Sequence, residues 1–277
     1  MMRGGWLSYW VYGAVAPPFL YGIARVCVDA TGYASDPLAL SLRQRAIVPL
    51  LPAMGIHTGA ARYLSRCLDR FSDVANGVVM PPVIFDSDLP AVREMLASAK
   101  SKGANYALVG NLGHLQTVMD AGLEAVGDYR FNLCNAESVA QMEALGVKSS
   151  ILSPELTLPQ IRDVGGNTAV IVYGRLPLMT LEKCVIREVA DCRACADHSV
   201  ALRDRRGVEF PILREWEHRN VICNSIPTCM SDREDALARA KVTARHFLFT
   251  TETPQEVNAV IEAHKKHAAV KGNVRRI

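Results

Sequence analysis

The chain has 277 residues, of which 49% are hydrophobic and 21% are charged. This balance excludes collagen, a coiled coil and a disordered chain, since a disordered chain lacks the apolar surface that offsets the entropy of ordering. Lysine and arginine total 31 residues and aspartate and glutamate total 28, so charge alone gives no argument for a nucleic-acid partner.

Residues 1–75 have no regular pattern, and no clear strand is predicted within 40–71. The stretch 4–28 is apolar and aromatic, but Pro17-Pro18 interrupts it. A spanning helix needs about 20 apolar residues without such a break. We therefore expect an irregular N-terminal arm, no membrane span and a cytoplasmic protein.

From residue 78 onward, short apolar runs alternate with amphipathic runs. The apolar runs predict strands and the amphipathic runs predict helices. Alternation at this spacing is typical of a parallel sheet built from βαβ units. The predicted strands are 106–110, 126–133, 149–152, 169–173 and 246–250, and the predicted helices are 89–102, 114–121, 136–145, 158–164 and a last one from 253.

Polar residues lie at the ends of several of the predicted strands, among them Asn132, Glu155 and Arg175. The C-terminal strand ends of a (β/α) barrel converge on its active site, so these residues favour a barrel over an open sheet. The alternative at each position is an ordinary turn or cap residue. We expect an α/β fold with a TIM-barrel-like parallel sheet, incomplete or atypical at its N-terminus. The expected units are an N-terminal segment (1–75), barrel units (76–180), a cysteine-rich metal-binding insert (181–232) and a barrel completion with a C-terminal helix (233–277).

Five of the eight cysteines fall between residues 184 and 229, which indicates a metal site before it indicates disulfides. Cys184, Cys192 and Cys195 have the spacing C-x7-C-x2-C, and a C-x2-C turn brings two sulfurs to one side. Four sulfur ligands suit zinc or an iron–sulfur cluster, and a single C-x2-C pair favours the cluster. The fourth ligand is Cys223 or His218, with Cys229 as third choice, and Cys27, Cys67 and Cys134 are expected in the core.

Several motifs follow one another in a specific order along the chain. The segment from Val172 to Met179 precedes the cysteines, and the segments 202–211 and 224–227 follow them. Related motifs extend the pattern back to 108–113 and 152–156 and forward to 248–252. Together they span roughly residues 78–262. In this order they resemble peptidase family U-32, also called the collagenase-like peptidases.

The resemblance implies a TIM-barrel-like domain and a 4Fe-4S cluster held by four cysteines. It also implies a group that includes oxygen-independent hydroxylases of RNA bases and of quinone precursors, some of which take oxygen from prephenate. Carried onto this chain, the cluster ligands are Cys184, Cys192, Cys195 and one more. The chain departs from the family at the fourth position, where His218 stands in place of a cysteine before Arg219-Asn220.

We expect a cluster-dependent hydroxylase that acts on RNA or a quinone precursor, with Glu155, Asn132 and Arg175 as catalytic residues. A guanidinium can hold an oxyanion with two hydrogen bonds, so arginines are candidates to bind a carboxylated or phosphorylated substrate. A partner subunit of the same family is a further expectation. The candidate substrate-binding residues are Arg175, Arg203, Arg205 and Asn224.

Two other functions stay open. The first is an accessory or binding protein in which a metal, zinc included, is structural. The second is a peptidase, as the family's name states. The sequence contains no H-E-x-x-H zinc helix, no G-x-S-x-G elbow and no cysteine–histidine pair in a recognisable nucleophile context, so hydrolysis has the weaker basis in the residues.

Overall fold

The computed structural model describes residues 24–29, 44–49, 75–189, 200–214, 219–252 and 254–270. The strands in these ranges form a nine-stranded sheet and a four-stranded sheet. The larger sheet has the strand order β12-β7-β13-β1-β2-β3-β4-β5-β6. Its strands are β1 (Ala24–Asp29), β2 (Gln44–Pro49), β3 (Ala75–Val79), β4 (Ala104–Val109), β5 (Glu124–Gly127), β6 (Ser150–Ile151), β7 (Thr168–Gly174), β12 (Thr228–Cys229) and β13 (Ala244–Phe249).

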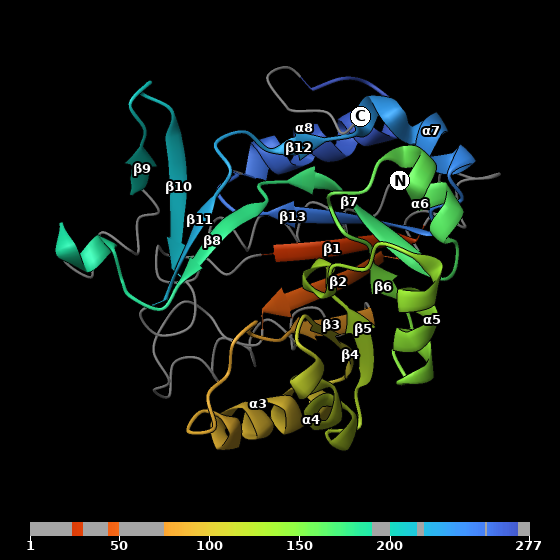
Figure 1. The fold of residues 1–277 in the computed structure, drawn as a ribbon, viewed down its shortest axis with the longest axis vertical. Coiled ribbons are helices and arrows are strands. Elements are labelled where there is room, and N and C mark those ends of the chain that lie inside the picture. The colour runs from red at the N-terminus through yellow and green to blue at the C-terminus, as the bar shows by residue number, and fades with distance from the viewer. Residues whose placement is uncertain are drawn as a thin grey trace, which may run out of the picture.

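The larger sheet is mostly parallel and strongly curled (Figure 1). Strands β2 to β7 pair in parallel in chain order, and β13 is parallel to β7. Because β6 pairs with β7 as well as with β5, the strand order closes on itself. The parallel α/β sheet predicted from the sequence is therefore confirmed.

The N-terminal part of the sheet differs from the rest. Strand β1 is antiparallel to both of its neighbours, β13 and β2. Strand β2 lies in the region for which no clear strand was predicted, so that expectation is wrong. A strand that reverses direction breaks the regular βαβ alternation on which the sequence interpretation depends, which explains why this part could not be recognised.

Helices lie around the curled sheet (Figure 1). The first, α3, buries Val92, Met95, Leu96 and Ala99, which repeat at helical spacing on one face. The bounds of α3, α4, α5, α6 and α8 agree with those predicted from the sequence to within a residue or two, whereas α7 was not predicted. The helices are α3 (Leu89–Ser101), α4 (Leu115–Asp120), α5 (Ala136–Ala144), α6 (Leu158–Val164), α7 (Glu234–Arg239) and α8 (Pro254–Lys265), with short 3-10 turns η4 (Leu112–His114), η5 (Tyr129–Phe131), η6 (Ile186–Glu188) and η7 (Ser231–Arg233).

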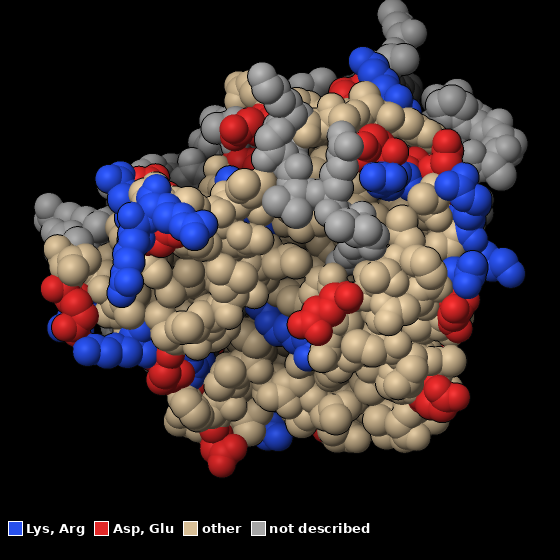
Figure 2. All heavy atoms as spheres, turned by 45° about the horizontal axis from the view of Figure 1, so that its top comes forward, with Lys and Arg blue, Asp and Glu red and all other residues tan. Residues whose placement is uncertain are grey.

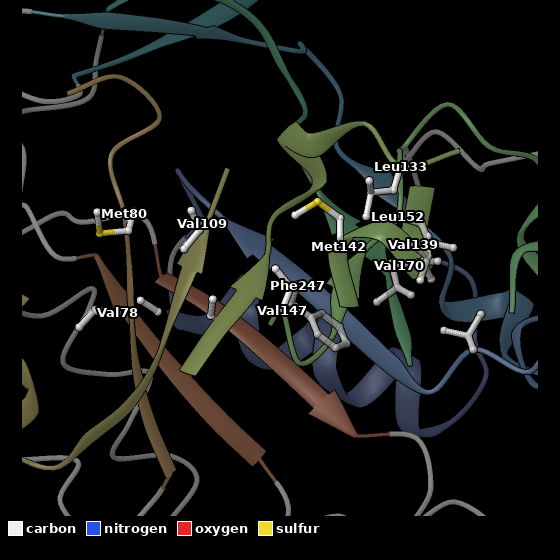
Figure 3. Close-up of a cluster of buried hydrophobic side chains, with 14 of the residues drawn as sticks. Val78, Met80, Val109, Leu133, Val139, Met142, Val147, Leu152, Val170 and Phe247 are labelled. Carbon is white, nitrogen blue, oxygen red and sulfur yellow. The ribbon is translucent and has the colours of Figure 1, made fainter. Parts of the chain in front are cut away.

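The core has two parts because successive side chains of a strand point to opposite faces of the sheet. On β4, Tyr106 and Leu108 belong to a cluster inside the curl, together with Ile151 and Ile171. Val109, from the same strand, belongs instead to the larger cluster that packs against the helices. Figure 3 shows part of this larger cluster, with side chains from several strands beside those of α5.

The four-stranded sheet is antiparallel and has the order β8-β11-β10-β9. Arg219, at the start of β11, anchors it to the larger sheet. The Arg219 side chain is buried, donates to the Val83 carbonyl oxygen at 3.0 Å and lies over the Phe85 ring. Its Nε is 2.5 Å from a Glu182 carboxylate oxygen. The strands are β8 (Pro177–Leu181), β9 (Ala201–Arg203), β10 (Glu209–Arg214) and β11 (Asn220–Cys223).

Two local predictions are wrong. The strand predicted for 126–133 ends at Gly127, because the Asp128 carboxylate accepts a hydrogen bond from the Tyr129 amide and caps a 3-10 turn. Cys134, expected in the core, is exposed. Within the ranges that the structure describes, no helix is long and apolar enough to span a membrane.

Candidate active site at the strand ends

The C-terminal ends of β4, β5, β6, β7 and β13 lie at one edge of the sheet because these strands are parallel. Polar and charged side chains follow each of them, as the barrel interpretation predicts. Three groups of contacts organise this edge. Their members are Asn132, Ser153 and Glu155 in the first group, Gly110, Asp128 and Arg130 in the second, and Tyr173, Arg175 and Glu252 in the third.

The first group brings together two of the predicted catalytic residues. Ser153 Oγ donates a hydrogen bond to Asn132 Oδ1 at 2.5 Å, and the Ser153 amide donates to the Leu133 carbonyl at 3.0 Å. The Glu155 amide donates to the same Ser153 Oγ at 3.3 Å. Ser153 is fully buried, whereas the Asn132 and Glu155 side chains are exposed. A buried serine therefore joins two exposed polar residues from neighbouring strand ends.

Asn132 also has a special backbone conformation. Its φ of 53° lies in the left-handed region, which asparagine tolerates better than most residues. Beside it, the Cys134 thiol donates to the Asn132 carbonyl oxygen at 3.1 Å. The turn at Asn132 thus places the Cys134 side chain on the surface, which is the physical reason that it is not a core residue.

The second group was not identified from the sequence. Arg130 Nη1 is 2.7 Å from Asp128 Oδ2, and the Asp128 carboxylate is almost fully buried. The Arg130 guanidinium lies over the Tyr129 ring, 5.0 Å from its centroid. A Cβ atom on Gly110 would lie 3.0 Å from Arg130 Cβ, so glycine at the end of β4 leaves the room that Arg130 occupies. This packing holds the Arg130 guanidinium in place, two residues before Asn132 of the first group.

The third group connects β7 to β13. Tyr173 Oη donates to Glu252 Oε1 at 3.2 Å, and Arg175 Nε is 3.9 Å from the same oxygen. The amides of Thr250 and Thr251 donate to Glu252 Oε2 at 2.6 and 3.1 Å. Burial, together with the Glu252 charge, raises the pKa of Tyr173 strongly, so its phenol stays protonated and acts as a donor.

Arg175 and Asn224 are brought together, as the sequence predicts, although the contact is made by the backbone of Asn224. Arg175 Nη1 donates to the carbonyl oxygens of Asn224 and Ser225. The guanidinium therefore holds the segment after β11 against the end of β7. In this arrangement Arg175 is a positioning residue.

Arg203 and Arg205 lie away from these groups. Arg203 belongs to β9 and Arg205 to the turn between β9 and β10, and both side chains are exposed. Arg203 Nη2 pairs with Glu209 Oε1 at 2.5 Å. Figure 2 shows lysine and arginine side chains gathered on the side of the molecule that carries β9 and β10 in Figure 1. The structure thus places them on a different element from Arg175.

The predicted metal ligands are described only in part. Cys192, Cys195 and His218 lie outside the described residues. Cys184 packs against Ile212 and Ile222, whereas Cys223 packs against Leu213 and Val221.

These neighbours alternate along β10 and β11, so Cys184 and Cys223 lie on opposite faces of the small sheet. In the part of the chain that the structure describes, no three His, Cys, Asp or Glu side chains come together as a metal site.

Comparison with known proteins places these strands in a family. The sequence model of peptidase family U32 matches residues 72–207. An uncharacterized protease of Methanocaldococcus jannaschii, MJ0090, is 33% identical over 85 residues, which is 31% of this chain and 21% of that protein. This chain thus matches about a fifth of the length of its curated relative.

Among solved structures, the U32 peptidase Mk0906 has a TM-score of 0.38 and 13% sequence identity, over 47% of this chain and 60% of that one. The segment that the family model matches, residues 72–207, contains β3 to β9, and with them Asn132, Ser153, Glu155 and Arg175. Three of the motifs that resemble the family, 108–113, 152–156 and 172–179, lie at the ends of β4, β6 and β7 in this segment. Through residues 72–207 the chain belongs to peptidase family U32.

Proposed function

We propose that this chain is a U32-family enzyme whose active site is the polar edge of a TIM-barrel-like sheet. We further propose that it carries out an oxygen-independent hydroxylation or a related redox reaction. The observation that supports an active site there is the hydrogen-bonded group Asn132, Ser153 and Glu155 at the ends of β5 and β6.

The geometry of this group suits proton transfer and substrate orientation. Glu155 presents an exposed carboxylate, and its backbone amide is tied to Ser153, so the residue is held in place while the side chain can meet a substrate. Asn132 is fixed by the same serine. In this proposal Glu155 accepts or donates a proton and Asn132 orients a polar group of the substrate.

Two arginines at this edge are the candidates to contact an anionic substrate group, and each also lies near a carboxylate: Arg130 is 2.7 Å from Asp128 and Arg175 is 3.9 Å from Glu252. Arg130 is held over Tyr129 by packing, and Arg175 is held against the 224–225 backbone. Both lie at ends of parallel strands, as Asn132 and Glu155 do. RNA, or a quinone-like precursor together with a small carboxylated co-substrate, has the chemistry that these cations recognise. The substrate class is part of the proposal.

A 4Fe-4S cluster is the proposed cofactor, and it would supply electron transfer when bound. Cys184, Cys192 and Cys195 would hold it, with His218 as the fourth ligand. The support for His218 over Cys223 is the packing of Cys223 on the face of β11 opposite to Cys184. Three thiolates and one imidazole also suit a structural zinc ion, so the metal must be identified directly.

The cofactor is tested by purifying the protein without oxygen, reconstituting it with iron and sulfide, and measuring the visible spectrum and metal content. We expect a brown protein that contains iron and sulfide. Cys184→Ala should lose the iron, whereas Cys223→Ala, the matched control, should keep it. A colourless protein with about one zinc per chain would overturn the cluster.

The active site is tested in cells that lack the chain and express its variants. Mass spectrometry of RNA nucleosides and of quinone precursors reports the hydroxylated product. Glu155→Gln should abolish the product, and Arg162→Ala, at an exposed residue of α6, should not. If Glu155→Gln cells keep the product, the strand-end group is not the active site, and an accessory role for the protein is supported instead.

A further inference from the structure

The strands β9 and β10 and the turn between them form an arm, residues 200–214, that projects from the body of the molecule (Figure 1). Arg205 and Arg206 lie in the turn at its tip, and both side chains are exposed. Among the residues that the structure describes, neither of these tip arginines has an ion-pair partner. Two adjacent guanidinium groups without counter-charges give the tip a positive potential, which attracts an anion.

The two acidic residues of the arm have other partners. Asp204 Oδ1 accepts hydrogen bonds from the amides of Arg206 and Val208, at 2.7 and 2.9 Å, so this carboxylate shapes the turn. Glu209 lies directly across from Arg203, and its carboxylate pairs with that guanidinium at 2.5 Å. The turn is therefore held in one conformation, and neither carboxylate pairs with the tip arginines.

One face of the arm, behind the tip, is apolar and open to solvent. Leu202 and Phe210 lie directly opposite each other in the strand pair, and Val208 stands two residues before Phe210, so the three side chains share a face. Leu202 is 51% exposed and Val208 is 38% exposed, and Phe210 is partly exposed. The arm thus offers an aromatic ring and two aliphatic side chains beside a cationic tip.

The arm lies away from the strand-end group. Figure 1 shows β9 and β10 on the opposite side of the molecule from β5 and β6, whose ends carry Asn132 and Glu155. Within the small sheet, β9 lies two strands beyond β11, which is about 10 Å at the usual strand spacing. A ligand that contacts both the arm and the strand-end group is therefore long, which a quinone precursor or a small carboxylate is not.

A single-stranded chain of phosphates that carries bases suits all of these features. Guanidinium groups hold phosphate oxygens with paired hydrogen bonds, and unpaired bases stack on aromatic rings. An acidic protein segment would use the cations but not the ring. A membrane surface would require apolar residues at the tip itself, where this arm has Arg205 and Arg206. The arrangement of charge and apolar surface thus favours a nucleic acid.

We propose that the arm is a docking surface for single-stranded RNA, in which the tip arginines bind phosphates and Phe210 stacks on a base. This inference rests on the proposed function, because it takes the strand-end group as the place where the RNA reacts. It names RNA, rather than a quinone precursor, as the substrate class.

The first test measures binding of the full chain to a fluorescein-labelled oligouridine of about 12 nucleotides by fluorescence anisotropy, from about 50 to about 200 mM salt. We expect the double variant Arg205→Gln/Arg206→Gln to bind at least about tenfold more weakly at the lowest salt. A phosphate contact contributes about 0.7 to the slope of log affinity against log salt for a single strand, so this slope should become shallower by about 1.4.

The matched control for the tip is the double variant Arg93→Gln/Arg239→Gln. It removes the same charge from exposed positions on α3 and α7, and neither arginine has an ion-pair partner among the described residues. The control should keep the affinity and the salt slope of the wild type. Equal losses of slope in the two double variants would overturn the proposal, because the attraction would then depend on net charge rather than on the arm.

The second test concerns the ring. Phe210→Leu keeps an apolar side chain in the sheet and removes the stacking surface, so we expect about tenfold weaker binding of the oligouridine. Binding of an abasic oligomer of the same length and charge should be unchanged by this substitution. Equal losses for the two oligomers would show that Phe210 supports the arm rather than a base, and would overturn its role in docking. Urea denaturation of each variant verifies that it is folded.

Competition separates RNA from other anionic partners. Unlabelled oligouridine should displace the labelled strand, whereas polyglutamate, or vesicles of phosphatidylglycerol and phosphatidylcholine in equal parts, should need at least about tenfold more negative charge to do so. Displacement by either competitor as effective as that by RNA would overturn the choice of RNA.

Failure of the arm and failure of the proposed function give different results. Glu155→Gln should bind the oligouridine as the wild type does while it forms no hydroxylated product. If binding depends on the tip arginines but loss of the chain from cells changes no RNA nucleoside, the proposed function fails and the arm remains an RNA-binding surface. If the salt slope is unchanged in Arg205→Gln/Arg206→Gln, the arm is not a docking surface, whatever the activity.

Discussion

Gly174 and Leu248 face each other across β7 and β13 so closely that a Cβ atom on Gly174 would overlap the Leu248 carbonyl oxygen. Gly174 also has a φ of 143°, which side-chain-bearing residues rarely adopt. This close approach of β7 and β13 places the next residue, Arg175, at the C-terminal edge of the sheet.

We therefore expect Gly174→Ala to lower the free energy of unfolding by about 3 kcal/mol, since neither backbone can move away without breaking the strand pair. Urea denaturation measures the change. Gly207→Ala is the control, because Gly207 also has a positive φ but has open space around its Cα. It should cost about 1 kcal/mol. Equal losses of unfolding free energy in the two variants would show that contact with Leu248 adds nothing to the cost of the positive φ.

The Glu234 carboxylate is the counter-charge for two buried cations, Arg245 and His264. Glu234→Gln would remove the carboxylate that neutralises these groups inside the protein, so we expect a loss of about 3–5 kcal/mol in the free energy of unfolding. Glu262→Gln is the control. It removes the carboxylate of an exposed pair, in which Glu262 Oε1 lies 2.8 Å from Lys265 Nζ, and should cost less than about 1 kcal/mol. A small effect of Glu234→Gln would contradict the buried network.

The same network gives a pH dependence on the acid side. Burial raises the pKa of Glu234, but His264 and Arg245 outweigh it and hold it below the usual value of 4.5. A carboxylate with a lowered pKa stabilises the folded state fully above pH 4.5, and this stabilisation is lost as the pH falls through the folded-state pKa. The difference in unfolding free energy between wild type and Glu234→Gln should thus be constant from pH 4.5 to pH 6.5 and shrink below pH 4.5, and it should also shrink on the alkaline side, as the pH rises through the raised pKa of His264. A difference in unfolding free energy that grows as the pH falls below 4.5 would contradict the predicted direction.

The sequence predicts regular elements well where the signals are local. The bounds of α6 match the prediction because Thr157 and Gln160 form a capping box and Pro159 lies in the first turn. The strand predicted for 126–133 fails because its apolar residues continue past Gly127 while Asp128 turns the backbone. A hydrogen bond that the Asp128 side chain accepts from the Tyr129 amide overrides the apolar pattern there.

The site could be predicted in part for a similar reason. Asn132 and Glu155 were found from their positions after strands, which is a local signal. The pairing of Glu234 with His264 leaves no such signal, because the two residues are 30 positions apart and meet only through the packing of α7 and α8. Distant contacts of this kind require the folded structure.

Asn132 offers a way to separate backbone from side-chain effects. Asn132→Gly keeps a residue that accepts a φ of 53° but removes the amide that Ser153 contacts. Asn132→Ala removes the same amide and adds backbone strain of about 1 kcal/mol. We expect the alanine variant to unfold at lower urea concentration than the glycine variant, and both to be equally impaired in the hydroxylation assay. Full activity of the glycine variant would leave Asn132 with a conformational role alone.

Arg219 determines how firmly the small antiparallel sheet is held against the larger one. Its buried guanidinium contacts Glu182, the Val83 carbonyl and the Phe85 ring. Arg219→Met keeps the apolar stem and loses the hydrogen bond to the Val83 carbonyl, worth about 1.5–3 kcal/mol. It also loses the pair with the solvent-exposed Glu182 carboxylate, worth less than about 1 kcal/mol. Amide hydrogen exchange in β8 and β11 should therefore become at least about tenfold faster.

Exchange in β4, within the larger sheet, is the internal reference and should not change, since a local loosening leaves the larger core intact. Arg206→Met, at an exposed position in the β9–β10 turn, is the matched control and should leave β8 and β11 as they are in the wild type. Faster exchange in β4 as well would mean that Arg219 supports the whole fold. Unchanged exchange in β8 and β11 would mean that their strand pairing, rather than Arg219, holds the small sheet.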